Sequence, residues 1–260
     1  MRALILLAWL CCTSAMAERT ARFEDTYGYT VFDTSTNRCV SAPVDITASG
    51  TPLDLVATEP DGNADDEGSV VLSLTAPFEY YGTAVEAVTA SSNGYLALGG
   101  AVDTENGGDF SNDCPLPAVP DNASPASGRI YPLHDDLVGA GQLHTEYFDS
   151  CPRPSGTSVD GACTVIQWTQ WQTLGAAKRF TFQVLLYHAS AAIAVQYVDI
   201  PAAALAGATL GLQNENSTSG ATIRCNSVEA QSPVQGFCAY DPRFPSLVVL
   251  DTVFADGFQE

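Results

Sequence analysis

Basic residues are scarce in this chain of 260 residues, which holds 10 Lys and Arg against 30 Asp and Glu. The formal net charge of −20 repels phosphate backbones and anionic membrane surfaces, which argues against a nucleic-acid partner. The same charge favours divalent cations and cationic surfaces as partners, although acidity can also serve only to keep an exported protein in solution.

Long apolar segments are missing too, because no run approaches the roughly 18 residues that a membrane-spanning helix needs. One shorter run, 3–12, follows a single charge at Arg2 and precedes the small-residue ending AMA. This pattern predicts a secretory signal peptide over 1–17, cut before Glu18. Loss of Arg2 changes the net charge to −21, and we expect a secreted protein without a membrane span.

Catalytic motifs are absent from the sequence. It has no Gly-x-Ser-x-Gly elbow, no His-Glu-x-x-His, no phosphate-binding Gly-Lys-Ser/Thr loop and no dinucleotide fingerprint. The three histidines, His134, His144 and His188, lie in or beside strand-like runs, which favours structural roles. His144 and Glu146 would share a strand face as a metal pair requires, but spacing indicates no third ligand. We therefore expect no enzyme activity.

Cysteines are plentiful for an exported chain, since six follow the signal peptide: Cys39, Cys114, Cys151, Cys163, Cys225 and Cys238. An even number in an oxidising compartment predicts disulfides, and six cysteines permit 15 pairings. Short separations favour the pairs 151–163 and 225–238, which leaves 39 with 114. No paired Cys/His spacing typical of zinc occurs.

Short runs rich in β-branched and aromatic residues, bounded by Gly, Pro, Asn and Asp, predict strands at 69–74, 85–90, 95–100, 163–171, 179–188, 192–200, 208–214 and 246–254. The only helical candidate is one short turn at 201–208. Frequent short strands without helices predict an all-β fold, a disulfide-stabilised antiparallel β-sandwich of jelly-roll type.

Alternation within one run assigns its faces. Phe180, Phe182, Val184 and Leu186 share one side, which we expect to face the core. Alternation resumes in the next run, so 179–198 is predicted to be a hairpin.

The stretch SSNG places Asn93-Gly94 between two strand-like runs. This pair is typical of a two-residue hairpin, in which both central residues need positive φ. Turn formation explains the pair, and a direct ligand role for Asn93 is the alternative.

The chain divides into segments that follow from these patterns. Long loop candidates, where binding sites usually reside, are 58–68, 99–128 and 227–245. We expect four segments: the signal peptide 1–17, an N-terminal extension or extra strand 18–43, the sandwich 44–245, and a C-terminal strand and tail 246–260.

Calcium is the one cation that the residues favour, because it prefers oxygen ligands. The stretch from Asp61 begins like an EF-hand loop, and then has Asp66 where Gly is needed and Leu72 where Glu is needed. For this stretch, an ordinary acidic turn and an irregular calcium loop both remain open. For the pair Asp135-Asp136, turn formation and cation contact both remain open. The calcium candidates are Asp61, Asp65, Asp66, Asp135 and Asp136. No other cofactor is expected.

An ordered set of motifs runs through 44–220, including DDEGSVVLSL (65–74), FEYYG (78–82), VTASSNGYLALGG (88–100), RIYPLHDDL (129–137) and ATLGLQNENSTSG (208–220). This order resembles secreted bacterial β-sandwich domains similar to the nidogen-type extracellular (NIDO) domain. His134 departs from the pattern, since such domains usually show Trp before the Asp pair. The resemblance implies a non-catalytic extracellular module found in adhesion and matrix proteins and beside exported enzymes.

The ending DTVFADGFQE resembles an (I/V)FADGFE tail of exported proteins from relatives of Xanthomonas and Lysobacter. This second resemblance implies a Gram-negative source. Together with the predicted signal peptide, it leads us to expect a secreted protein that is extracellular, periplasmic or at the outer surface.

Three functions remain open. The first is a non-catalytic module that mediates surface or matrix interaction with an extracellular protein or glycan, aided by calcium. The second is an exported hydrolase or accessory carbohydrate-binding module with its site in the long loops. The third is a structural envelope component.

Overall fold

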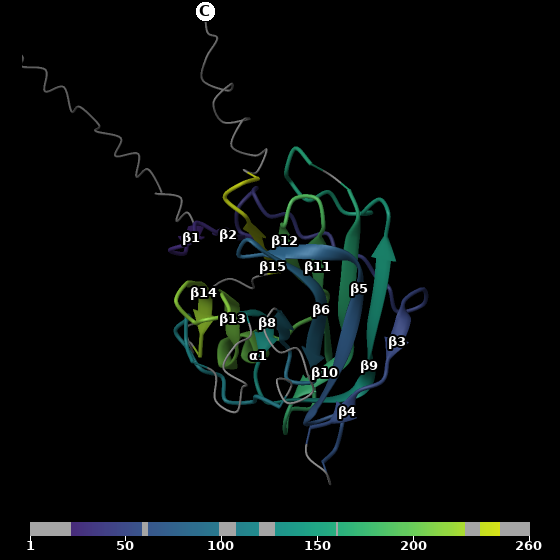
Figure 1. Ribbon diagram of the computed structural model, residues 1–260. Helices are drawn as coiled ribbons and strands as arrows, with labels where there is room; N and C mark the ends of the chain where they lie inside the picture. The colour runs from purple at the N-terminus through teal and green to yellow at the C-terminus, as the bar shows by residue number, and fades with distance from the viewer. Residues whose placement is uncertain are drawn as a thin grey trace, which may run out of the picture.

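The computed structural model describes residues 22–58, 62–98, 108–119, 128–159, 161–226 and 235–244. These residues form two antiparallel sheets that pack face to face, with one short helix (Figure 1). The antiparallel β-sandwich predicted from the sequence is therefore confirmed. Within the described ranges no helix is long and apolar enough to cross a membrane.

The first sheet has eight strands and includes both described ends of the chain. Its order is β1 (Arg22–Glu24), β2 (Thr30–Asp33), β15 (Gly236–Tyr240), β12 (Ile193–Tyr197), β11 (Phe180–Tyr187), β10 (Cys163–Thr173), β9 (Leu137–Phe148) and β3 (Thr51–Leu53). Because β1 and β2 pair inside this sheet, the segment expected as an N-terminal extension contributes two strands to the sandwich.

The second sheet has seven strands. Its order is β14 (Gly220–Cys225), β13 (Thr209–Gln213), β8 (Gly128–His134), β7 (Leu96–Leu98), β6 (Thr83–Ser91), β5 (Gly68–Tyr80) and β4 (Val56–Ala57). The short helix predicted at 201–208 is confirmed as α1 (Ala202–Gly207).

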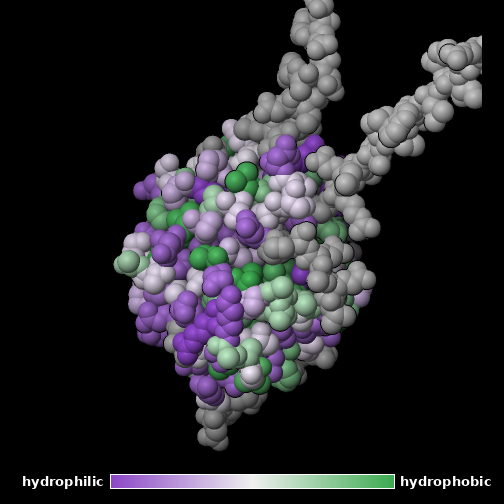
Figure 2. All heavy atoms as spheres, turned by 180° about the vertical axis from the view of Figure 1, so that it is seen from behind, coloured by the Kyte–Doolittle hydropathy of each residue, from purple (hydrophilic) through white to green (hydrophobic). Residues whose placement is uncertain are grey.

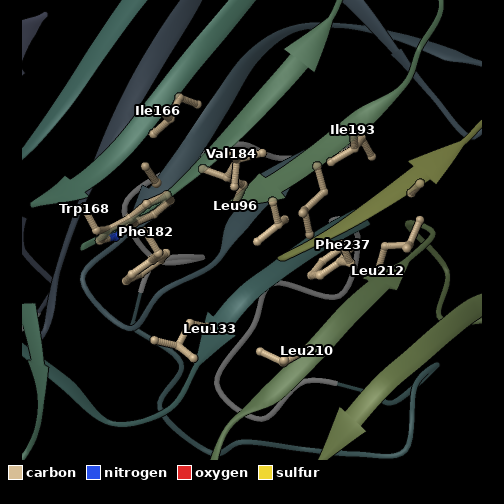
Figure 3. Close-up of a cluster of buried hydrophobic side chains, with 14 of the residues drawn as sticks. Leu96, Leu133, Ile166, Trp168, Phe182, Val184, Ile193, Leu210, Leu212 and Phe237 are labelled. Carbon is tan, nitrogen blue, oxygen red and sulfur yellow. The ribbon is translucent and has the colours of Figure 1, made fainter. Parts of the chain in front are cut away.

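The core lies between the sheets, and apolar residues of β7, β8 and β13 face those of β10, β11, β12 and β15 (Figure 3). The predicted β11–β12 hairpin is confirmed, with Phe182 opposite Tyr197 and Leu186 opposite Ile193. Trp168 stacks on Phe182 with ring centroids 4.9 Å apart. The predicted core face of β11 is therefore correct.

The opposite face of β11 is buried as well, which the alternation of the sequence does not indicate. Segment 40–47 crosses this outer face and lies over Gln167, Gln183 and Gln196, which are side by side on β10, β11 and β12. The glutamine oxygens accept backbone N–H groups of alternate residues: Ala42 to Gln196 (2.7 Å), Val44 to Gln183 (2.7 Å) and Ile46 to Gln167 (3.4 Å). The row of glutamine side chains thus forms the hydrogen bonds that water would form with the backbone of an exposed segment.

Three disulfides staple the sandwich, and one of the predicted pairs, Cys151–Cys163, is correct. The other two predicted pairs are wrong, because the bonds are Cys39–Cys238 and Cys114–Cys225. Cys238 lies in β15, a strand of the eight-stranded sheet beside β2, whereas Cys225 ends β14 of the other sheet. The prediction from short sequence separation is therefore wrong, because the chain crosses from one sheet to the other between Cys225 and Cys238.

Several strands lie where the sequence predicts loops or nothing. β15 falls inside the predicted loop 227–245, and β9 contains two glycines and several polar residues that weaken its alternation. The predicted signal peptide, the strand at 246–254 and the C-terminal tail lie outside the described residues.

Candidate functional site

The SSNG turn connects β6 to β7 and lies at one end of the sandwich. Ser91 N–H donates to the Tyr95 carbonyl at 3.0 Å, which closes a loop one residue longer than the predicted two-residue hairpin. Such a loop needs positive φ at one residue, and only Gly94 has it (φ +71°) within this turn. The hairpin prediction is correct in place and wrong in type.

Asn93 is fully buried and joins this turn to two other connections. Its Nδ2 donates to Glu67 Oε2 at 3.2 Å, in the connection between β4 and β5. Its Oδ1 accepts the N–H of Leu137 at 3.0 Å, where β9 begins, and its carbonyl oxygen lies 2.9 Å from His134 Nδ1. The side chain therefore fixes three loops relative to one another.

Ser92 secures the same junction from the neighbouring position. Its hydroxyl donates to the Asp66 carbonyl and accepts the N–H of Gly68 at 2.9 Å. Asn63 shapes the β4–β5 connection locally, because its side chain accepts the N–H of Asp65 and its carbonyl accepts the N–H of Glu67. These bonds hold consecutive acidic residues on a short, defined turn.

The three loops bring Asp66, Glu67 and Asp136 together. One carboxylate oxygen of each lies within 4.8 Å of the others, and all three side chains are half-buried. Calcium takes oxygen ligands at about 2.3–2.6 Å, so two ligands on opposite sides of the ion stand about 4.6–5.2 Å apart. The upper limit of 4.8 Å lies within that span, so one calcium ion can contact all three oxygens.

Electrostatics at the cluster favour a positive charge. Burial, together with Asp66 and Asp136, raises the pKa of Glu67 to about 7. Burial and the nearby Asp66 also raise the pKa of Asp136. Within the described part of the chain, buried Oδ1 atoms of Asp66 and Asp136 lack a hydrogen-bond partner. Both observations indicate carboxylate oxygens that a bound cation would stabilise.

The sequence-predicted calcium candidates separate in the structure. Asp66 and Asp136 belong to the cluster, and Glu67 was missed because the EF-hand template uses that position through its backbone carbonyl and not through its side chain. Asp135 instead accepts the N–H of Asp136 and the side-chain amide of Asn112, and burial raises its pKa to about 6.

The two remaining candidates lie elsewhere. Asp65 lines a separate surface hollow. Asp61 lies outside the described residues.

His134 is a structural residue beneath these loops. Its Nδ1 faces the Asn93 carbonyl, and its Nε2 accepts the N–H of Asn112 at 3.4 Å. Burial lowers its pKa, which keeps the ring neutral in this arrangement. Beside it, Asp109 forms a buried ion pair with Arg129. This network anchors residues 108–119 to the seven-stranded sheet.

The other two histidines are also held by structural contacts. His144 is buried, and its Nδ1 lies 3.4 Å from Thr169 Oγ1. Glu146 accepts the Ser49 hydroxyl at 2.5 Å. His188 contacts the Thr164 hydroxyl and a backbone carbonyl. Among the described residues, neither His144 nor Glu146 joins a cluster of three metal-ligating groups.

Tyrosines near the FEYYG corner form packing contacts. Tyr80 is buried and its hydroxyl donates to backbone carbonyls of Arg129 and Gln213. Tyr81, at positive φ, donates to Asp25 at 2.5 Å. A hollow of about 110 Å³ lies beside them, and the rings of Tyr80 and Tyr81 pack edge to face with centroids 4.8 Å apart, so these rings serve the fold.

Two antiparallel sheets and three disulfides define the molecule as a disulfide-stabilised β-sandwich, and the disulfides are compatible with a location outside the cell. The family model described as "NIDO related" matches residues 32–237. The chain therefore belongs to the NIDO-related family. No curated protein and no solved structure gave a significant match.

Proposed function

We propose that the protein is a non-catalytic extracellular interaction module whose loop end is fixed by a calcium ion. The observation that carries this proposal is the meeting of Asp66, Glu67 and Asp136 from two connections far apart in sequence. Three acidic groups in a half-buried site repel one another unless a proton or cation lies between them. Calcium supplies the charge and joins the loops.

A non-catalytic role agrees with how the histidines are used. Each has a hydrogen-bond partner that belongs to the framework, and the most buried of them, His134, is enclosed by two backbone groups. Side chains held in this way are unsuited to shuttle protons to a substrate.

The surface supports recognition through charge. On the face in Figure 2, hydrophilic side chains form the larger patches and hydrophobic ones lie between them. The exposed large hydrophobic residues among those described come from separate elements, for example Val71 on β5, Val198 after β12 and Phe110 in segment 108–119. An extracellular protein or glycan surface that complements a strongly acidic chain is the partner class that fits this surface.

The calcium site is tested by thermal unfolding of the oxidised, exported protein in excess EDTA and across a calcium titration. A ligand at 100 times its Kd stabilises the folded state by about 2.7 kcal/mol, which raises the midpoint by roughly 5–10 °C for a domain of this size. Sites in extracellular modules bind calcium with Kd of about 10⁻⁴–10⁻³ M, so 100 times Kd is about 10–100 mM and the titration should extend to about 100 mM.

Paired variants locate the response. Glu67→Gln with Asp136→Asn should abolish the calcium-dependent rise, because it removes two of three charged ligands. Glu86→Gln with Asp149→Asn removes the same charge from exposed positions on β6 and after β9 and should leave the rise intact. An unchanged midpoint for the unmodified protein, or an equal response of both variants, would refute the site.

A further inference from the structure

A hollow of about 250 Å³ opens where the first sheet ends at its β3 edge and the chain crosses to the second sheet. It lies between β3, the two residues that lead to β4, the end of the β4–β5 turn and β9. Its lining residues are Pro52, Leu53, Asp54, Leu55, Asp65, Gln142 and Leu143.

The floor of the hollow is apolar and its rim is acidic. Leu53 lies opposite Leu143 in the β3–β9 pair, and Leu143 is buried. Leu55 packs against the main core, as Leu53 does. Asp54 and Asp65 are exposed, and within the described residues neither carboxylate has a hydrogen bond or an ion pair to another side chain. The hollow therefore offers a small aliphatic surface, from the partly exposed side chains of Leu53 and Leu55, below two uncompensated negative charges.

Size and edge geometry limit what can enter. Sites for drug-sized ligands have volumes of roughly 300–1,000 Å³, so this smaller hollow suits a single side chain. Addition of a strand to β3 is disfavoured, because the strand has three residues and Pro52 provides no N–H. The occupant is therefore more naturally a side chain than an extended backbone.

Charge selects the side chain. Lysine and arginine have a long aliphatic stem that packs on apolar surface while the charged end stays at the rim. The protein attracts such residues over long range, since its net charge is −20 and two of its few basic residues, Arg129 and Arg153, are buried.

We infer that this hollow is a docking site for a basic side chain of a partner protein, with the stem on Leu53 and Leu55 and the charged end at the rim that Asp54 and Asp65 form. The inference rests on the proposed function and names the partner chemistry of that module.

The test is an NMR titration of the isotope-labelled, oxidised protein with a short peptide that has blocked ends and one lysine as its only charged group, and with its ornithine and norleucine counterparts. The amide signals of Leu53, Leu55 and Leu143 should shift saturably with the lysine peptide. Ornithine has one fewer methylene, so its affinity should be about fourfold lower, and norleucine lacks the charge and should bind more weakly still.

A double variant, Asp54→Asn with Asp65→Asn, should weaken lysine binding about 2- to 25-fold, from about 1.5- to 5-fold for each exposed ion pair. The control with equal charge loss, Glu86→Gln with Asp149→Asn, should leave the affinity unchanged. Signals that shift over the whole acidic surface, equal binding of lysine and ornithine, or no saturation at about 10 mM peptide would overturn the inference.

Failure here is distinguishable from failure of the proposed function. Asp54 and Asp65 do not belong to the carboxylate cluster, so the double variant should retain its calcium-dependent midpoint. A calcium response without lysine binding would remove the docking site alone, whereas lysine binding without a calcium response would remove the cation site alone.

Discussion

The side chain of Asn93 provides a sharp test of how the loop end is held. Asn93→Ala removes the donor to Glu67 and the acceptor of the Leu137 N–H, and the latter group is buried. A buried donor left without a partner costs about 1–3 kcal/mol, and a lost bond to a charged group adds about 1 kcal/mol or more. We therefore expect a loss of about 2–4 kcal/mol, which corresponds to a midpoint lower by roughly 5–15 °C.

Urea unfolding of the oxidised protein measures this loss. The control is Asn216→Ala, since Asn216 is exposed in the β13–β14 turn and its replacement should change stability by less than about 0.5 kcal/mol. A loss below about 1 kcal/mol for Asn93→Ala would refute the role of the buried amide as a tie between loops.

A second substitution at this position separates the tie from the cation. Asn93→Asp keeps an oxygen for the Leu137 N–H but sets a carboxylate against Glu67, so it should destabilise the protein in EDTA. Calcium should narrow the difference from the unmodified protein, because the ion gains a charged neighbour. If calcium leaves the difference unchanged, the cluster does not bind the ion, although the structural tie would still stand.

Three further predictions concern single positions. The pKa of Glu67 is raised to about 7 from an ordinary value of 4.5, so its contribution to stability is present below pH 4.5 and lost as the pH rises through 7. In EDTA, calorimetry should therefore find Glu67→Gln more stable than the unmodified protein at pH 8 and equally stable near pH 4. Gly94→Val should destabilise the protein by at least about 2 kcal/mol in thermal unfolding, because a Cβ there would lie 2.1 Å from the Leu133 carbonyl at positive φ. Gln183→Leu removes bonds to both the N–H and the carbonyl of Val44 and should speed amide hydrogen exchange across 40–47, whereas unchanged exchange would show that the glutamine row does not hold this segment.

Much of the sandwich could be predicted because its signal is local. Alternation in 180–187 assigns a core face without reference to any other strand, and the structure places those residues in the core. The turn at Gly94 is equally local, since one residue must adopt positive φ.

The parts that could not be predicted depend on contacts between distant segments. The glutamine row is buried because segment 40–47 lies over it, and nothing in the alternation of β10, β11 or β12 indicates that cover. The disulfide Cys39–Cys238 likewise depends on the pairing of β2 with β15. Its two cysteines are separated by 199 residues in the sequence.

The acidic site was only partly predictable, because it too depends on a contact between distant segments. Composition directs attention to calcium, and Asp66 and Asp136 are among the residues chosen from the sequence. Glu67 was absent from that choice because the EF-hand template uses its position through the backbone carbonyl, and the meeting of this loop with Asp136 depends on the fold.

The Asn-Gly pair shows how a turn signal and a site signal can overlap. Formation of the hairpin requires only Gly94, whose φ is +71°, and Asn93 is not among the residues with positive φ. The burial of Asn93 and its bonds to Glu67 and Leu137 therefore have no origin in turn geometry. An asparagine at this position is explained by what it joins: the amide group both donates and accepts, so it can neutralise part of the repulsion at Glu67 while it satisfies a buried N–H. Alanine in its place would complete the turn and remove the side-chain bonds to Glu67 and to the Leu137 N–H, although Ser92 and the bond from the Gly139 N–H to the Asp65 carbonyl would remain.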